Sequence, residues 1–138
     1  MHKLIHFRNE ITFFIPLKTL FCKILALGFL LAGLNHFVNS AFYLKIIPPV
    51  FPAPLFLIYL SGAFEIVLGI LLLIPKFTRL AAWGLIALLI AVFPANVYMA
   101  MNTELFPEFS PTALYLRLPL QLLFLAWAFW FTRQKNLD

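Results

Sequence analysis

The chain has 138 residues, of which 64% are hydrophobic and only 11% are charged, and its mean hydropathy is +0.99. Because a soluble domain carries roughly 25% charged residues, this composition excludes that class and indicates an all-α integral membrane protein. The net charge of +5 is accounted for by membrane topology and by attraction to anionic lipid, so nucleic acid is not expected as a partner.

The first segment, residues 1–18, mixes Lys and Arg with Phe and Ile before Pro16. This mixture fits a short helix lying in the membrane interface, and it fits a frayed tail equally well. A cleaved signal peptide is less favoured, because the charges are spread too far from an apolar run and no small-x-small site follows. We therefore expect residues 1–18 to form a cytoplasmic or interfacial segment.

Long apolar stretches follow, and each is about the 20 residues that a helix needs to cross a bilayer. Leu, Ile and Phe surround each stretch instead of alternating with polar residues, which favours helices over barrel strands. The connections are short and contain or adjoin prolines, so that sequential helices become antiparallel neighbours. The sequence predicts a four-helix transmembrane bundle over residues 19–132 and a cytoplasmic tail over 133–138, with spans at 19–38, 53–74, 80–101 and 113–132.

The distribution of Lys and Arg predicts the orientation. With four spans, one side of the membrane carries the N-terminal segment, the connection between the second and third spans, and the tail. That side holds eight cations, whereas the other side holds Lys45, Glu104 and Glu108. By the positive-inside rule both termini are cytoplasmic, and the protein is a multi-pass protein of the cell membrane. The eight cations are Lys3, Arg8, Lys18, Lys23, Lys76, Arg79, Arg133 and Lys135.

Thiol and metal chemistry find little support in the sequence. Cys22 is the single cysteine, so an intramolecular disulfide cannot form, and we interpret this residue as a small apolar group at a helix start. His2 and His6 are four residues apart, but no third ligand is nearby, and no metal site is expected.

Glu65 is the most informative residue, because no other charge occurs in residues 53–74. A central Asp, Lys or Arg costs about 2.5–3.5 kcal/mol on insertion scales, and such residues usually face a bundle interior or a cavity. Counting about 1.5 Å per residue from the outer edge puts Arg117 about 6 Å deep, Gln121 and Ser61 about 12 Å deep and Glu65 about 18 Å deep. All four helices contribute to this outer half, and the candidate polar pocket consists of Asn35, His36, Ser61, Glu65, Asn96, Arg117 and Gln121.

Spacing within the helices supports this grouping. Ser61 and Glu65 are four residues apart, as are Arg117 and Gln121, so each pair projects from one helix face. Small residues that let a neighbouring helix approach occur in the stripe Gly28, Ala32 and His36, and at Gly62 and Gly69 beside Glu65. Pro94 and Pro119 lie inside spans next to Asn96 and Gln121, where a bend would widen the bundle.

Arg117 is the natural partner of Glu65 on this reasoning. Long side chains could bridge the difference of about 12 Å in backbone depth, and Gln121 or a water molecule could link the two groups. Two interpretations stay open. The polar residues form a buried network that only sets helix packing, or they form a pocket for a polar head group or a proton-coupled cofactor.

Five segments together resemble the DoxX-like family of small four-helix membrane proteins, over about residues 20–130. They are GLNHF (33–37), FYLKIIPP (42–49), YLSGAFEIVLGILLLIP (59–75), AAWGLIALLIAVFPANVYMA (81–100) and RLPLQLLFLAW (117–127). The resemblance implies a four-helix bundle associated with membrane redox systems, including quinone-linked ones, and with membrane or periplasmic redox proteins as partners. It also implies that Tyr43, Pro48, Gly62 and Pro94 are family-typical, together with the seven pocket residues. Relatives that perform thiol chemistry use paired cysteines, which this chain lacks.

Three functions follow as hypotheses. The first is a subunit or accessory factor of a membrane redox system that binds a quinone or a lipid in the outer-half pocket. The second is a structural or assembly protein without a ligand. The third is a small-molecule or proton transporter, which the apolar inner halves at residues 66–74, 80–91 and 122–131 disfavour. An enzyme is the least expected, because no nucleophile and base pair, phosphate loop or metal cluster is readable.

Overall fold

The computed structural model describes the backbone of residues 2–133 and the side chains of residues 17–133. Within this part the chain is helical and contains no strand. The long helices are α1 (His2–Val38), α3 (Pro54–Leu72), α4 (Thr78–Met101) and α5 (Pro111–Thr132). Short helices connect them: α2 (Ser40–Ile46), η1 (Pro75–Phe77) and η2 (Thr103–Leu105).

Four helical stretches are long and apolar enough to cross a membrane, as the composition predicts: Leu17–Val38, Pro54–Leu72, Pro75–Met101 and Pro111–Thr132. Even the shortest, with 19 residues, is about 28 Å long at 1.5 Å per residue, which matches the hydrocarbon thickness of a bilayer. The expected division at residue 18 is not a break between elements, because α1 is one continuous helix. Residues 134–138 of the predicted tail lie outside the described part of the chain.

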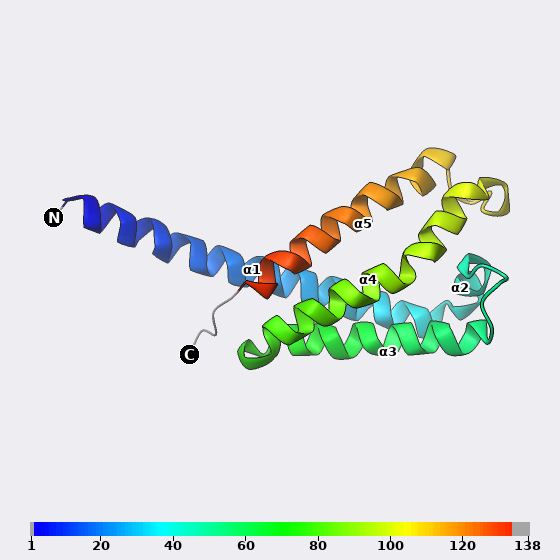
Figure 1. Ribbon diagram of the computed structural model, residues 1–138, viewed down its shortest axis with the longest axis horizontal. Coiled ribbons are helices and arrows are strands. Elements are labelled where there is room, and N and C mark those ends of the chain that lie inside the picture. Colours follow the sequence, from blue (N-terminus) through cyan, green and yellow to red (C-terminus); the bar gives the residue numbers. More distant parts are fainter. Residues whose placement is uncertain (1, 134–138) are drawn as a thin grey trace.

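The helices are arranged as two antiparallel pairs (Figure 1). Close backbone packing occurs between α1 and α3 and between α4 and α5, and α4 also contacts α3. The α4–α5 pair diverges from the α1–α3 pair toward the end that carries α2 (Figure 1). Pro94 lies inside α4 and Pro119 inside α5, as expected. The fold is therefore a bundle whose two halves separate toward one end.

Two glycines let α1 and α3 approach closely. A Cβ added to Gly33 would lie 2.7 Å from the carbonyl oxygen of Gly62, and one added to Gly62 would lie 2.8 Å from Cβ of His36. Gly69 packs on α1 in the same way, with Cγ of Leu30 3.0 Å from such an added atom. Gly28 has nothing within 4 Å of its added Cβ. The predicted stripe was therefore wrong at Gly28, because the face of α1 that meets α3 carries Gly33 instead.

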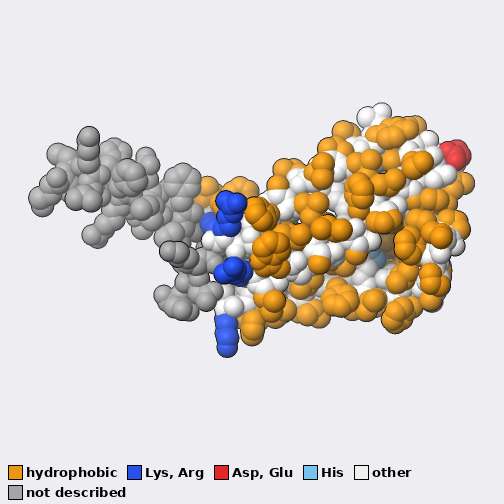
Figure 2. Space-filling view, viewed as in Figure 1, with side chains coloured by type: hydrophobic (Ala, Val, Ile, Leu, Met, Phe, Trp, Pro, Cys, Tyr) orange, Lys and Arg blue, Asp and Glu red, His pale blue; other side chains and the backbone are white. Residues whose placement is uncertain are grey.

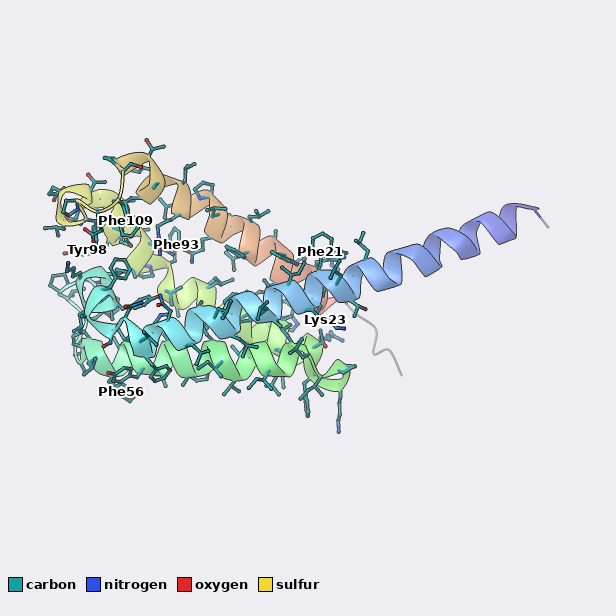
Figure 3. The ribbon with its side chains drawn as sticks, turned by 180° about the vertical axis from the view of Figure 1, so that it is seen from behind. Phe21, Lys23, Phe56, Phe93, Tyr98 and Phe109 are labelled. Carbon is teal, nitrogen blue, oxygen red and sulfur yellow. The ribbon has the colours of Figure 1, made fainter. Side chains whose placement is uncertain are left out.

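Apolar cores close the bundle at its two ends. At one end, buried residues of all four long helices pack together, including Cys22, Leu72, Leu85 and Phe131. At the other end, Ile46 of α2 packs with Met99, Phe106 and Leu114. We call the first the basic-end core and the second the α2-end core. In Figure 3, Phe21 and Lys23 lie at the basic end, whereas Tyr98 and Phe109 lie at the α2 end.

Charge is divided between the same two ends. Figure 2 shows Lys and Arg side chains gathered at one end of the described bundle and acidic side chains at the opposite end. The sequence explains this separation, because Lys76 and Arg79 flank the start of α4 whereas Glu104 and Glu108 lie between α4 and α5.

Candidate functional site

The corner between α1 and α2 organises the first polar group. Asn39 ends α1, and its backbone N–H donates to the carbonyl oxygen of Asn35 at 2.8 Å. Its side-chain amide donates to Asn35 Oδ1, and Asn35 Nδ2 in turn donates to the Tyr43 hydroxyl at 2.9 Å. Tyr43 stacks on the ring of His36, with centroids 4.0 Å apart. The corner thus holds Tyr43 against the end of α1.

Glu65 of α3 contacts the residues of this corner through the ring of His36. Its Oε2 lies 3.2 Å from His36 Nδ1, and the same Nδ1 lies 2.8 Å from the carbonyl oxygen of Ala32. One ring nitrogen carries a single proton, which cannot serve both acceptors fully, and Glu65 Oε2 is left without a hydrogen-bond partner. Glu65 is only 8% exposed. The carboxylate is therefore buried and incompletely satisfied.

Ser61 lies one turn before Glu65 on α3, and its Oγ is also buried without a hydrogen-bond partner. Two unsatisfied oxygens thus occur on the same helix face, as the spacing of four residues predicted. We call Asn35, His36, Asn39, Tyr43, Ser61 and Glu65 the α1–α3 network.

The second polar group joins α4 and α5. Arg117 Nε donates to Asn96 Oδ1 at 3.3 Å, and Asn96 Nδ2 donates to Gln121 Oε1. Gln121 is buried, and its Nε2 donates to the carbonyl oxygen of Leu89, in the part of α4 that precedes Pro94. The chain of donors and acceptors is continuous from Arg117 to the α4 backbone. We call Asn96, Arg117 and Gln121 the α4–α5 network.

The expected ion pair between Glu65 and Arg117 is not formed. Among the described residues, the basic group within 4.0 Å of the Glu65 carboxylate is His36. The Arg117 guanidinium instead donates a hydrogen bond to Asn96. The reason is the pairing of the helices: α3 packs on α1 and α5 packs on α4, so each charge finds a partner within its own pair. The structure thus brings Asn35, His36 and Glu65 together, and separately brings Asn96, Arg117 and Gln121 together.

Tyr43 and Asn39 belong to the α1–α3 network but were not in the predicted pocket, although the family resemblance included Tyr43 among its typical positions. Burial raises the pKa of the Tyr43 hydroxyl, the charge of Glu65 raises this pKa further, and the Asn35 hydrogen bond and the charge of Arg117 lower it. The charges of Glu65 and Arg117 therefore both act on this one hydroxyl. One available signal was the spacing Asn35, Asn39, Tyr43, with four residues at each step, which continues one polar face past the end of α1.

Cys22 lies in the basic-end core, away from these networks. Its thiol is buried and lies 3.4 Å from the carbonyl oxygen of Leu72, to which it donates. Within the described part of the chain, no three His, Cys, Asp or Glu side chains are grouped so that they could hold a metal ion. His2 and His6 lie outside the side chains that the structure describes.

A family model described as Domain of unknown function (DUF8561) matches residues 25–132, which span the four membrane helices and both polar networks. No curated protein and no solved structure matches the chain.

Proposed function

The chain belongs to the family described as Domain of unknown function (DUF8561), a description that assigns no activity, and from the site itself we propose that it binds a membrane amphiphile by its polar head. The head would lie between the α1–α3 and α4–α5 networks, and quinones and lipids are the two candidate classes. In this role the protein is an accessory factor or subunit of a larger membrane system.

The observation that carries the proposal is the unsatisfied carboxylate of Glu65. A buried polar atom without a partner costs about 1–3 kcal/mol, and more if it is charged. Native structures seldom leave such a cost uncompensated unless the atom serves a ligand, an ion or a catalytic role. Glu65 Oε2 and Ser61 Oγ are such atoms, and their residues are one turn apart on α3. Trp127 Nε1 is the remaining such atom among the described residues, and its side chain packs against the basic-end core.

Copurification tests the proposal directly. The protein is extracted into nanodiscs from its host membrane, and bound quinones and lipids are quantified by mass spectrometry. We expect a defined amphiphile in the wild type and its loss in Glu65→Gln, which keeps the side-chain shape and removes the charge. Glu108→Gln is the matched control, because Glu108 is an exposed carboxylate in the connection before α5. Identical small-molecule content in all three proteins would refute the proposal.

Packing at the basic end supports a closed site in preference to a conduit. Ala81, Ala82, Leu85, Ala128 and Phe131 are all 0% exposed there. A transporter would need polar groups that continue through this core. Proteoliposomes that accumulate a solute or protons above the level of empty vesicles would favour the transport alternative.

A structural role is the second candidate, and the α4–α5 network favours it. Its hydrogen bonds run without interruption from Arg117 to the Leu89 carbonyl, as expected of a network that sets helix packing. If the whole site were structural, removing one member of either network, as in Glu65→Gln or Gln121→Leu, would destabilise the protein while its content of bound small molecules stayed unchanged.

The orientation and the redox association are further parts of the proposal. We place both termini in the cytoplasm, because the described Lys and Arg side chains at the basic end fit the positive-inside rule. A fluorescent protein fused after residue 138 should then fluoresce, and alkaline phosphatase at the same position should be inactive.

The link to membrane redox proteins follows from the resemblance to the DoxX-like family. Crosslinking in the native membrane that captures an oxidoreductase would support it.

A further inference from the structure

The two networks present opposite charges that do not neutralise each other. Glu65 is held in the α1–α3 pair, and Arg117 in the α4–α5 pair. We propose that the site selects a head group that carries a primary ammonium and a phosphate, as in phosphatidylethanolamine, with the ammonium at Glu65 and the phosphate at Arg117. This inference rests on the proposed function, since it names the ligand class of the same site.

The α3 side of the site requires hydrogen-bond donors. Glu65 Oε2 and Ser61 Oγ are the two buried oxygens without partners. An alkylammonium offers three N–H donors in a compact group, so that a single ligand nitrogen can serve both oxygens. A hydrogen bond between an ammonium and a carboxylate is charge-assisted and about twice as strong as a neutral one. The ammonium would therefore satisfy the feature of the site that the protein itself leaves unsatisfied.

On the α5 side, the unused donors of Arg117 require hydrogen-bond acceptors from the ligand. Arg117 uses its Nε on Asn96, and within the described part of the chain its Nη atoms donate to no protein acceptor. A guanidinium presents its donors in a planar fork that matches two phosphate oxygens. The Tyr43 hydroxyl accepts its hydrogen bond from Asn35, so its own proton is available to the same phosphate. Arg117 and Tyr43 together make a donor set for an anion.

The two sides of the site approach each other at Tyr43, which packs against the α2-end core, as does Ala95, the residue before Asn96. The charges of Glu65 and Arg117 both act on the Tyr43 hydroxyl, in opposite directions. Tyr43 also stacks on His36, which is the direct partner of Glu65. A hydroxyl that contacts one network and senses the charge of the other lies at the place where a zwitterion would join them.

Other amphiphiles match the site less completely. A quinone head carries carbonyl acceptors and no N–H donor, so Glu65 Oε2 and Ser61 Oγ would stay unpaired. A choline head carries the positive charge on a quaternary nitrogen, which cannot donate a hydrogen bond. A glycerol head supplies hydroxyl donors but no positive charge for Glu65. The ammonium, with its protons, is therefore the group that the site should distinguish.

Native mass spectrometry of the full chain in defined lipid mixtures tests this inference. The probes are phosphatidylethanolamine, its N-monomethyl and N-dimethyl derivatives, phosphatidylcholine and an isoprenoid benzoquinone. We expect occupancy to fall along the methylation series, with phosphatidylethanolamine favoured over phosphatidylcholine by about tenfold or more, because a hydrogen bond to a charged group contributes that much. Glu65→Gln should bring this ratio close to one, and Ser61→Ala should reduce it partly. Arg117→Gln should weaken both lipids alike, and Glu108→Gln should change nothing.

The outcomes separate the two proposals. A wild-type protein that prefers the quinone, or binds all the lipids equally, overturns the selection of an ammonium while the binding of an amphiphile stands. A protein that binds none of the probes overturns both. If Glu65→Gln does not fold, the wild-type methylation series and Ser61→Ala decide the question alone. Competition by soluble O-phosphoethanolamine distinguishes a free head group from a lipid: we expect the lipid to be displaced only weakly, and strong displacement would overturn the assignment to a lipid.

Discussion

The two helix pairs differ in whether hydrogen bonds within the protein satisfy their polar side chains. In the α4–α5 pair, Asn96 and Gln121 complete a chain of hydrogen bonds that ends on the Leu89 carbonyl. In the α1–α3 pair, Glu65 Oε2 competes with the Ala32 carbonyl oxygen for one imidazole proton and is left without a hydrogen bond. The first arrangement is self-sufficient, whereas the second is complete only with a further donor.

This difference separates two uses of polarity in a membrane protein. A network that satisfies itself stabilises packing, because removing one member leaves the others unpaired in an apolar medium. A group that stays unsatisfied lowers the stability of the fold and is available for a ligand. Changes in the α4–α5 network should therefore affect stability, and changes at Glu65 should affect binding.

The largest effect is expected where the α1–α3 pair is tightest. Gly33→Ala would place a Cβ 2.7 Å from the Gly62 carbonyl oxygen, which is backbone and cannot move cheaply. Overpacking of this kind costs about 1–3 kcal/mol, and we expect a value near the upper limit. Thermal unfolding in detergent measures it. Gly28→Ala is the matched control, because nothing lies within 4 Å of that position. Equal melting temperatures for the two variants would contradict the observed pairing of α1 with α3.

Gln121→Leu tests the self-sufficient network and should have the next largest effect. The change removes the acceptor for Asn96 Nδ2 and the donor for the Leu89 carbonyl, so a partly buried amide and a buried carbonyl lose their partners. We expect a loss of stability of about 2 kcal/mol, within the range for unsatisfied buried groups. Leu122→Ala, at a position that is 61% exposed, controls for a change on the same helix. If Gln121→Leu is as stable as that control, the α4–α5 network does not stabilise packing, and the contrast between the two helix pairs is wrong.

Glu65→Gln should have a much smaller effect on stability, within about 1 kcal/mol of zero, although it removes the preference for an ammonium head group. The charge of a partly satisfied carboxylate is costly to bury, and its removal offsets the loss of the contact with His36. Unfolding of ligand-free protein is the required measurement, because a bound ligand adds its own stabilisation. A loss as large as that of Gln121→Leu would assign Glu65 to a structural network.

The sequence predicts much of this architecture because the relevant signals are local. Apolar length locates the four helices, and spacing places Ser61 with Glu65 and Arg117 with Gln121 on shared faces. Gly62 and Gly69 were recognised as packing positions for the same reason. Each of these inferences concerns one helix at a time.

What the sequence could not supply is how one helix is rotated and paired against another. Both Gly28 and Gly33 are small, and only the packing shows that Gly33 is the one that meets α3. Glu65 and Arg117 have complementary charges, yet α3 and α5 belong to different pairs. Tyr43 was left out of the predicted pocket, because only the folded structure shows that α2 stacks the tyrosine on His36.

The smallest expected effect is a shift in the ionisation of Tyr43, and it reports on both pairs at once. Burial and the charge of Glu65 hold the pKa of this hydroxyl above its ordinary value of 10.0, while Arg117 opposes them. Glu65→Gln should therefore lower the pKa of Tyr43, and Arg117→Gln should raise it. Phenolate absorbance during alkaline titration measures the shift, and subtracting the Tyr43→Phe protein removes the signal of the other tyrosines.

The sign of this shift also fixes its effect on stability. A raised pKa means that the folded protein holds the Tyr43 proton more tightly than the unfolded chain does. The resulting stabilisation is complete below pH 10.0 and is lost as the pH rises through the pKa of the folded protein. Glu65→Gln should reduce this loss of stability at alkaline pH, and Arg117→Gln should increase it. Shifts in the same direction for both variants would show that the two charges do not meet at Tyr43, and the two networks would then be separate sites.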